Sequence, residues 1–216
     1  MIDLKKYSCI IWDWNGTLLD DAWLCVDVMN GMLKERYLPL KTIEEYMELF
    51  DFPVKDYYAK LGYDFDTEPF NKVGMEFINR YNVRQGETRL HPGAVSVLET
   101  FKARGFDQSI LSAREQKELL TETTALGVHG FFNRIYGLDD HYAHGKTEVG
   151  FKLVHDLGIP EEKMLYLGDT RHDAEVAVEI GIDCILIANG HHSQDRLQQL
   201  GVPLIASLTE LNKLLW

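Results

Sequence analysis

The stretch SCIIWDWNGT, residues 8–17, is an apolar run that ends in an acid, an amide and a glycine. Continuous apolar runs of this length are typical of strands that are buried on both faces of a parallel sheet. Ligands of open parallel sheets bind beyond the carboxyl ends of the strands, which is where Asp13 is expected. By itself the pattern D-x-N-G-T is a weak signal, because a carboxylate there suits a nucleophile, a metal ligand or a helix cap.

Similar apolar runs recur along the chain and alternate with segments of helical periodicity. The predicted strands are Ser8–Trp12, Gln108–Leu111, Arg134–Tyr136, Met164–Leu167, Cys184–Ala188 and, more weakly, Val202–Ile205. The clearest predicted helices, each followed closely by a glycine, are Gly93–Arg104, Glu115–Leu126 and Glu148–Leu157. This alternation predicts an α/β fold with a Rossmann-like, doubly wound parallel sheet in a three-layer α/β/α core.

One long stretch breaks the alternation. Residues 21–87 show apolar positions at helical spacing and no convincing strand, and Pro39, Pro53 and Pro69 divide them into three or four helices. We therefore expect a small helical domain at 21–87, inserted into a core formed by residues 1–20 and 88–216.

Composition narrows the possible partners. The 216 residues carry a net charge of −12, which disfavours nucleic acid. No apolar run is long enough to span a membrane, and Met1–Lys6 lacks the apolar run of a signal peptide, so a cytoplasmic location is expected. Cys9, Cys25 and Cys184 are odd in number and far apart, which predicts neither a disulfide framework nor a zinc site.

A second strand also ends in acids. Leu165–Leu167 leads into Gly168-Asp169, and Asp173 follows four residues later. At the start of a helix these carboxylates would lie close together, either as a helix cap or as oxygen ligands for magnesium. Ser112 follows the strand Gln108–Leu111 and is expected at the head of a helix, as an N-cap or a donor to a phosphoryl oxygen. Lys146 follows His144-Gly145 just before another helix.

Taken in order, these residues resemble the four signature motifs of the haloacid dehalogenase superfamily. D-W-N-G-T at 13–17 is similar to its D-x-D-G-T, Ser112 to its second motif, Lys146 to its third, and Gly168–Asp173 to its G-D-x-x-x-D. The resemblance covers nearly the whole chain, although residues 21–87 match only in position, size and helicity. The pattern is most similar to the phosphoglycolate phosphatase and sugar-phosphate phosphatase branch, in which a helical cap follows the first strand.

The resemblance implies a magnesium-dependent phosphatase that forms an aspartyl-phosphate on Asp13. It implies metal ligation by Asp13, Asp169 and the backbone carbonyl of Asn15, with Asp173 orienting the metal, and charge neutralisation by Lys146. Contacts to the phosphoryl group or substrate would come from Trp14, Gly16, Thr17, Ser112, Ala113, Arg114 and Lys146. The implied substrate is a small phosphorylated metabolite that a closing cap shields from water, and the implied assembly is a monomer or homodimer.

Asn15 departs from the family pattern. Most family phosphatases carry a second Asp there, which protonates the leaving group, whereas an amide cannot do so. A phosphonatase also lacks that Asp and would need a lysine from the insert. A phosphate-binding regulatory protein without turnover is a further alternative, and the acids Asp169 and Asp173 argue against a metal-free 2-haloacid dehalogenase.

Three other sites are weaker candidates. His172 is close enough to Asp169 to replace the missing acid. The pair His191-His192 is expected in a solvated loop near the rim of the site. Trp12 is expected in the core and Trp14 beside the pocket.

Overall fold

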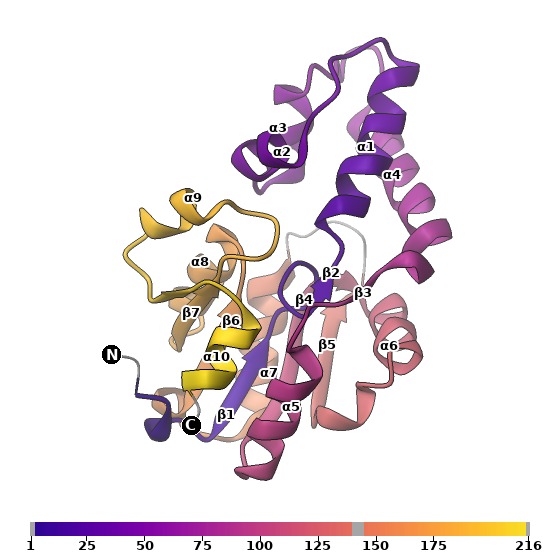
Figure 1. Ribbon diagram of the computed structural model, residues 1–216. Helices are drawn as coiled ribbons and strands as arrows, with labels where there is room; N and C mark the ends of the chain where they lie inside the picture. Colours follow the sequence, from indigo (N-terminus) through magenta and orange to yellow (C-terminus); the bar gives the residue numbers. More distant parts are fainter. Residues whose placement is uncertain (1–2, 140–144, 215–216) are drawn as a thin grey trace.

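The computed structural model describes residues 3–139 and 145–214, so Met1, Ile2 and His144 lie outside the described residues. Its main sheet has six strands in the order β5-β4-β1-β6-β7-β8, and all of its pairings are parallel (Figure 1). The strands are β1 (Cys9–Trp12), β4 (Asp107–Glu115), β5 (Arg134–Leu138), β6 (Met164–Gly168), β7 (Asp183–Ile187) and β8 (Leu204–Ile205).

Helices cover both faces of this sheet because successive strand residues point to opposite sides. Ile10 and Trp12 pack with α5 (Ala94–Ala103), α6 (Gln116–Ala125) and α10 (Leu208–Leu214), whereas Cys9 and Ile11 pack with α7 (Lys146–Leu157) and α8 (Arg171–Glu179). The helix α9 (Gln194–Gln198) packs beside β7 and α8. Short 3-10 helices are η1 (Leu4–Lys6), η2 (Gln85–Glu87), η3 (His129–Phe131) and η5 (Glu161–Lys163).

The remaining helices form a separate group at the top of Figure 1, which we call the helical unit. It consists of α1 (Ala22–Glu35), α2 (Ile43–Leu49), α3 (Val54–Lys60) and α4 (Phe70–Arg84). These helices share a core of their own, and α2 begins with a capping box made by Thr42 and Glu45. A short antiparallel pair, β2 (Leu19–Asp20) and β3 (Arg89–Leu90), joins the helical unit to the sheet.

The predicted fold class is confirmed. All six predicted strands are present, and four helices lie within residues 21–87. The predicted end of the second large strand is wrong: β4 continues past Leu111 to Glu115, because its pairing with β5 resumes after an irregularity. The division into core and cap residues stays a proposal.

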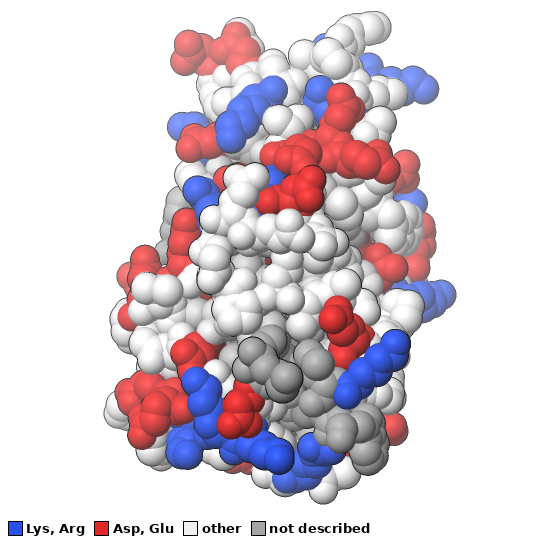
Figure 2. All heavy atoms as spheres, turned by 60° about the vertical axis from the view of Figure 1, so that its left-hand side comes forward, with Lys and Arg blue, Asp and Glu red and all other residues white. Residues whose placement is uncertain are grey.

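The surface carries mixed charges. On the face shown in Figure 2, basic and acidic side chains are interspersed. No helix among residues 3–139 and 145–214 is long and apolar enough to cross a membrane. Cys9, Cys25 and Cys184 are all free thiols.

Candidate active site

Asp13 and Asp173 share one buried lysine at the carboxyl edge of the sheet. Asp13 follows β1 directly, and its Oδ1 accepts a hydrogen bond from Lys146 Nζ at 2.5 Å. The same ammonium donates to Asp173 Oδ1 at 2.7 Å. Lys146 is the first residue of α7 and only 3% exposed. The topology thus brings together three residues that the sequence places far apart.

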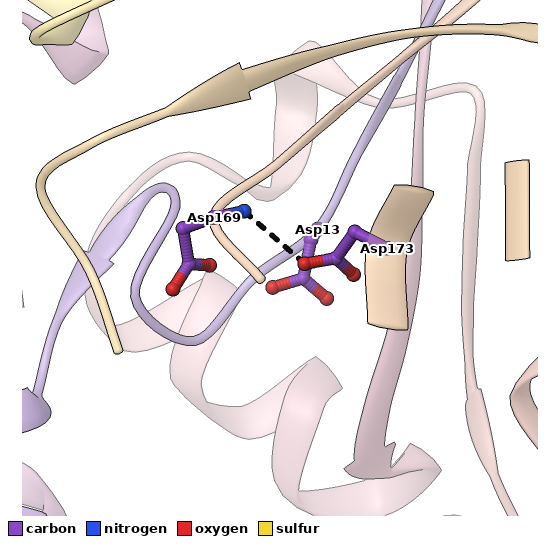
Figure 3. Close-up of side chains that lie close together, drawn as sticks. All are labelled: Asp13, Asp169 and Asp173. Atoms are coloured by element: carbon purple, nitrogen blue, oxygen red, sulfur yellow. Dashed lines mark hydrogen bonds between the residues drawn. The ribbon is translucent and has the colours of Figure 1, made fainter. Parts of the chain in front are cut away.

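Asp169 completes a cluster of three buried carboxylates (Figure 3). One oxygen from each of Asp13, Asp169 and Asp173 lies within 4.8 Å of the others. Thr17 donates to Asp169 Oδ1 at 2.7 Å, so its side chain positions a carboxylate. Thr170 caps α8 in a capping box with Asp173, whose Oδ2 accepts from the backbone amides of both Asp169 and Thr170. Asp173 is therefore both a helix cap and a member of the cluster.

The cluster carries more negative than positive charge. Its three carboxyl groups face one ammonium, so the fully ionised cluster has an excess of two negative charges. Burial raises the pKa of Asp13 to about 8, against the opposing pull of Lys146. Burial likewise raises the pKa of Asp169 to about 6. Despite its burial, Asp173 has a pKa well below the usual range because Lys146 and Thr170 stabilise its charged form. The site thus favours a bound cation of double charge.

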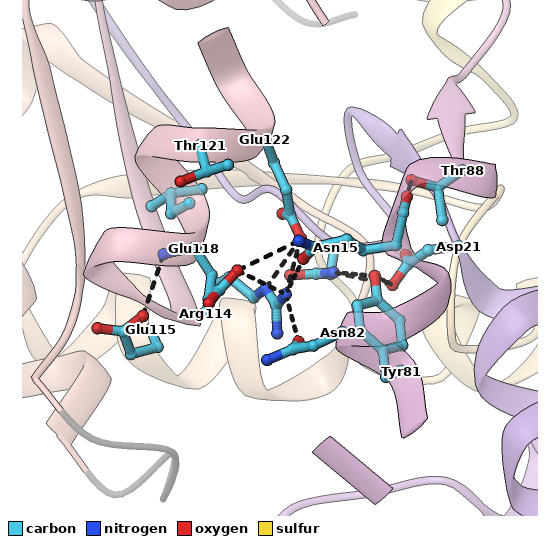
Figure 4. Close-up of polar contacts among 12 residues, drawn as sticks. Asn15, Asp21, Tyr81, Asn82, Thr88, Arg114, Glu115, Glu118, Thr121 and Glu122 are labelled. Atoms are coloured by element: carbon cyan, nitrogen blue, oxygen red, sulfur yellow. Dashed lines mark hydrogen bonds and ion pairs between the residues drawn. The ribbon is translucent and has the colours of Figure 1, made fainter. Parts of the chain in front are cut away.

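Asn15 turns its side chain toward the helical unit (Figure 4). Its Nδ2 donates to Asp21 Oδ2 at 2.8 Å and lies 3.2 Å from the hydroxyl of Tyr81. Tyr81 also donates to Asp21 Oδ2, at 2.8 Å. Asp21 precedes α1 and Tyr81 lies in α4, so the amide of Asn15 connects the turn after Asp13 to two helices. Asp21 and Tyr81 were not predicted as site residues, since neither belongs to a recognisable motif.

The expectation of a solvated His191-His192 loop is wrong. His191 is 6% and His192 is 2% exposed. The backbone amide of His191 donates to Asp169 Oδ2 at 2.7 Å, and its Nε2 lies 3.4 Å from Asp21 Oδ1. Although burial favours the neutral ring, Asp21 raises the pKa of His191 to about 9. The hydroxyl of Tyr46, in α2, lies 2.8 Å from His191 Nδ1, which links this loop to the helical unit.

Arg114 and Trp14 are held by a common partner. Arg114 Nη2 donates to Glu122 Oε1 at 2.8 Å and also to Asn82 and Gln85 (Figure 4). Trp14 Nε1 donates to Glu122 Oε2 at 2.8 Å, and its side chain is fully buried in the core, as is that of Trp12. The expectation that Trp14 borders the pocket is therefore wrong for its side chain.

Two further expectations change with the backbone geometry. Ser112 does not head α6, because it lies within β4 and Glu115 caps that helix. Its hydroxyl accepts a hydrogen bond from the backbone amide of Arg114 at 3.0 Å, and both Ser112 and Ala113 line the site cavity. The amide of Gly16, predicted to help hold a phosphoryl oxygen, instead donates to Asp21 and to the carbonyl of Leu19.

A cavity of about 500 Å³ connects this cluster with the helical unit. Asp13, Asn15, Ser112, Lys146 and Asp173 line one part, and α1–α4 supply much of the rest. His172 also lines the cavity, with its ring centroid 4.7 Å from that of Phe52, and its role as an acid stays a prediction.

Comparison with known proteins identifies relatives across nearly the whole chain. Residues 10–187 match the family model described as haloacid dehalogenase-like hydrolase. The phosphoglycolate phosphatase of Rhodobacter capsulatus is 23% identical over 84% of this chain and 84% of its own length. That of Yersinia pestis is 27% identical over 89% of this chain and 85% of its own. A haloacid dehalogenase-like family hydrolase from Streptococcus pneumoniae superposes with a TM-score of 0.82 at 21% identity, covering 98% of this chain and all of that one.

Proposed function

The chain belongs to the haloacid dehalogenase-like hydrolase family, and from this premise we propose that it is a magnesium-dependent phosphatase of small phosphate monoesters. The observation that carries the proposal is the buried group of Asp13, Asp169, Asp173 and Lys146, of which Asp13, Asp173 and Lys146 line the cavity. The names of the two phosphoglycolate phosphatases support the reaction class. At 23% and 27% identity they do not decide the substrate.

The donor set suits magnesium. Carboxylate oxygens are the ligands this ion prefers, and a divalent cation would balance the two surplus negative charges of the cluster. Asp13 and Asp169 would hold it together with the backbone carbonyl of Asn15. Asp173, whose oxygens already accept bonds from Lys146, Thr170 and the Asp169 amide, would orient the site. When bound, the ion would neutralise charge on the phosphoryl oxygens.

The proposed reaction has two steps. A carboxylate oxygen of Asp13 forms a bond to phosphorus as the bond to the ester oxygen breaks, which yields an aspartyl-phosphate and an alkoxide that takes a proton from solvent to become the alcohol. Water then attacks the phosphorus of this intermediate, releasing inorganic phosphate and restoring Asp13. Lys146 offsets negative charge at both stages, and the hydroxyl of Ser112 donates a hydrogen bond to a phosphoryl oxygen. Asn15 cannot supply the proton for the leaving alcohol, which predicts slow turnover of alkyl phosphates.

The test is a screen of phosphate monoesters, including nitrophenyl phosphate, with magnesium, with calcium and with excess chelator. We expect turnover only with magnesium and inhibition by calcium, which demands more ligands and longer bonds. The matched variant Asp13→Asn keeps the shape of the side chain, and it should fold normally and lose hydrolysis. If this variant retained half the parent rate, Asp13 would not be the nucleophile.

The phosphonatase alternative has its own test. It requires a lysine of the helical unit to form a Schiff base, and Lys55 is the lysine of α1–α4 that lines the cavity within the described residues. Lys55 is exposed, and its ammonium lies 5.7 Å from the centroid of the Phe65 ring. Borohydride trapping with a phosphonoaldehyde, compared between the parent and Lys55→Arg, would detect that chemistry. We expect no trapped adduct.

A further inference from the structure

The wall of the cavity above the carboxylates is mainly aromatic and aliphatic. Side chains from all four helices of the helical unit and from the loop between α2 and α3 contribute, among them Met29, Tyr46, Phe50, Tyr57, Phe77 and Tyr81. Tyr46, Tyr57 and Tyr81 are 3%, 2% and 4% exposed, so they form a preorganised surface. A volume of about 500 Å³ lies within the range of pockets that enclose ligands much larger than phosphoglycolate. A two-carbon substrate would leave most of this wall without contact.

The buried cations of the cavity are already paired. Lys146 bonds to Asp13 and Asp173, and Arg114 bonds to Glu122 at 2.8 Å. His191 lies 3.4 Å from Asp21. Among the described residues that line the cavity, Lys55 is the remaining lysine or arginine that could meet an anion, and it is exposed. A second anionic group on the substrate would therefore compete with carboxylates for each buried cation.

Two of the residues that line the cavity, Tyr57 and His172, carry a buried polar atom without a partner among the described residues, and Tyr57 belongs to the wall that the helical unit forms. The hydroxyl of Tyr57 is buried and makes no hydrogen bond within the described residues. Buried hydroxyls are usually satisfied, and an unpaired one costs free energy. Because Tyr57 lines the cavity, a ligand bound there is the candidate partner for this hydroxyl.

We propose that the substrate is the phosphate monoester of a hydrophobic, ring-bearing alcohol that carries one neutral hydrogen-bonding group and no second anion. The inference rests on the proposed function, because the phosphate is placed at Asp13. The ring occupies the aromatic cavity of the helical unit, and the neutral group pairs with Tyr57.

The first experiment compares primary alkyl phosphates whose leaving alcohols are similar, so that differences report binding. The series is ethyl, benzyl and naphthylmethyl phosphate, with 2-phosphoglycolate and glucose 6-phosphate for comparison. Burial of the added ring should raise kcat/KM for naphthylmethyl over ethyl phosphate by roughly 10- to 100-fold. A preference for phosphoglycolate or the sugar phosphate would overturn the inference.

The second experiment narrows the cavity. Gly74 lines it from α4, and a Cβ there would meet only the Phe70 ring, at 3.8 Å. The Cβ of Gly74→Leu therefore fits, and the rest of the side chain adds bulk at the cavity wall while the substitution replaces a poor helix former. It should lower the ratio of kcat/KM for naphthylmethyl over ethyl phosphate at least roughly tenfold. The control Val83→Leu changes an exposed position of the same helix and should leave that ratio unchanged.

The third experiment tests the hydroxyl. Pyridylmethyl phosphates have nearly the shape of benzyl phosphate and add a ring nitrogen that accepts a hydrogen bond. In the parent protein the best pyridylmethyl isomer should exceed benzyl phosphate in kcat/KM by roughly 2- to 12-fold, and Tyr57→Phe should abolish that advantage. If Tyr57→Phe lowers both rates equally, the hydroxyl does not pair with the ligand.

The outcomes separate the two proposals. If no ester is hydrolysed, nitrophenyl phosphate included, and Asp13→Asn matches the parent, the phosphatase function fails. If hydrolysis depends on Asp13 while the naphthylmethyl-to-ethyl ratio is near one and insensitive to Gly74→Leu, the function stands and the substrate inference fails.

Discussion

Asn15→Asp offers the sharpest test of the site, because the contacts of Asn15 predict how this substitution affects stability. The amide of Asn15 donates to Asp21 Oδ2 at 2.8 Å. A carboxylate in its place would put two negative oxygens at that separation. At an effective dielectric constant of about 20 the repulsion is about 6 kcal/mol.

Protonation limits this cost. A protonated Asp at position 15 can donate to Asp21 as the amide does, and holding an ordinary carboxyl in that form costs about 1.4 kcal/mol for each pH unit above its usual pKa. We therefore expect Asn15→Asp to lower the free energy of unfolding by about 4 kcal/mol at pH 7 and by about 1.5 kcal/mol at pH 5. The sign follows from linkage: the folded variant binds a proton that the unfolded chain releases, so its stability falls as pH rises.

The assay is urea unfolding at pH 5, 6 and 7 for four proteins: the parent, Asn15→Asp, Asp21→Asn and the double variant that combines both substitutions, which we call the double exchange. In the double exchange the hydrogen bond persists with donor and acceptor reversed. We expect it to recover at least half of the lost stability and to show no steep pH dependence of the deficit. A deficit in Asn15→Asp below about 1 kcal/mol at pH 7, or the same pH slope in the double exchange, would refute the electrostatic reasoning.

The contact between positions 15 and 21 also decides how to test whether a carboxyl at position 15 can donate a proton to the leaving group. Asn15→Asp alone confounds proton donation with repulsion from Asp21, so the double exchange is the better catalyst to measure. A carboxyl at position 15 should accelerate alkyl phosphates more than nitrophenyl phosphate, since nitrophenolate leaves without a proton. The ceiling of that gain is on the order of 10²–10⁴-fold. An equal gain for both leaving groups would mean that the carboxyl is not donating a proton.

Three further predictions concern the cluster and its supports. Magnesium at about 100 times its Kd should raise the free energy of unfolding by about 2.7 kcal/mol, reversibly with chelator, and a shift of the same size in Asp13→Asn would argue against ligation by Asp13. Thr17→Val removes the hydroxyl that bonds to Asp169 and should weaken magnesium binding about 10- to 100-fold in a thermal-shift titration, whereas Thr17→Ser should not. Arg114→Met leaves Glu122 buried without its cation and should cost about 3–5 kcal/mol in urea unfolding; if adding Glu122→Gln recovers nothing, the pair is not responsible.

The sheet was predictable because most of its strands are apolar runs followed by a glycine, an acid or a turn. The ends of the strands were harder to predict wherever strand pairing depends on a partner that is distant in the sequence. The polar residues after Leu111 hide the continuation of β4, which exists because Glu115 pairs with Leu138 of β5. The pairing of β2 with β3 involves two residues on each side, too few for any periodicity to show.

The carboxylates and Lys146 were found because their order and strand positions form a pattern. The partners of Asn15 were not, because Asp21 and Tyr81 approach it only through the placement of α1 and α4. His191 is buried because its loop closes over Gly16: a Cβ at Gly16 would lie 2.5 Å from the His191 ring. This close contact depends on the tertiary fold, and the local sequence around the two histidines does not indicate it.

These contacts give Asn15 a physical role in the resting protein. Its amide holds Asp21, at the start of α1, and lies within hydrogen-bond distance of Tyr81, in α4, so both long helices of the helical unit are tied to the turn that carries Asp13. Movement of those helices away from the sheet must either break these bonds or shift the turn. A carboxylic acid at position 15 could donate a proton to a leaving group, but its ionised form would repel Asp21 and weaken the connection. In this chain, therefore, Asn15 couples the helical unit to the turn that carries Asp13, the proposed nucleophile.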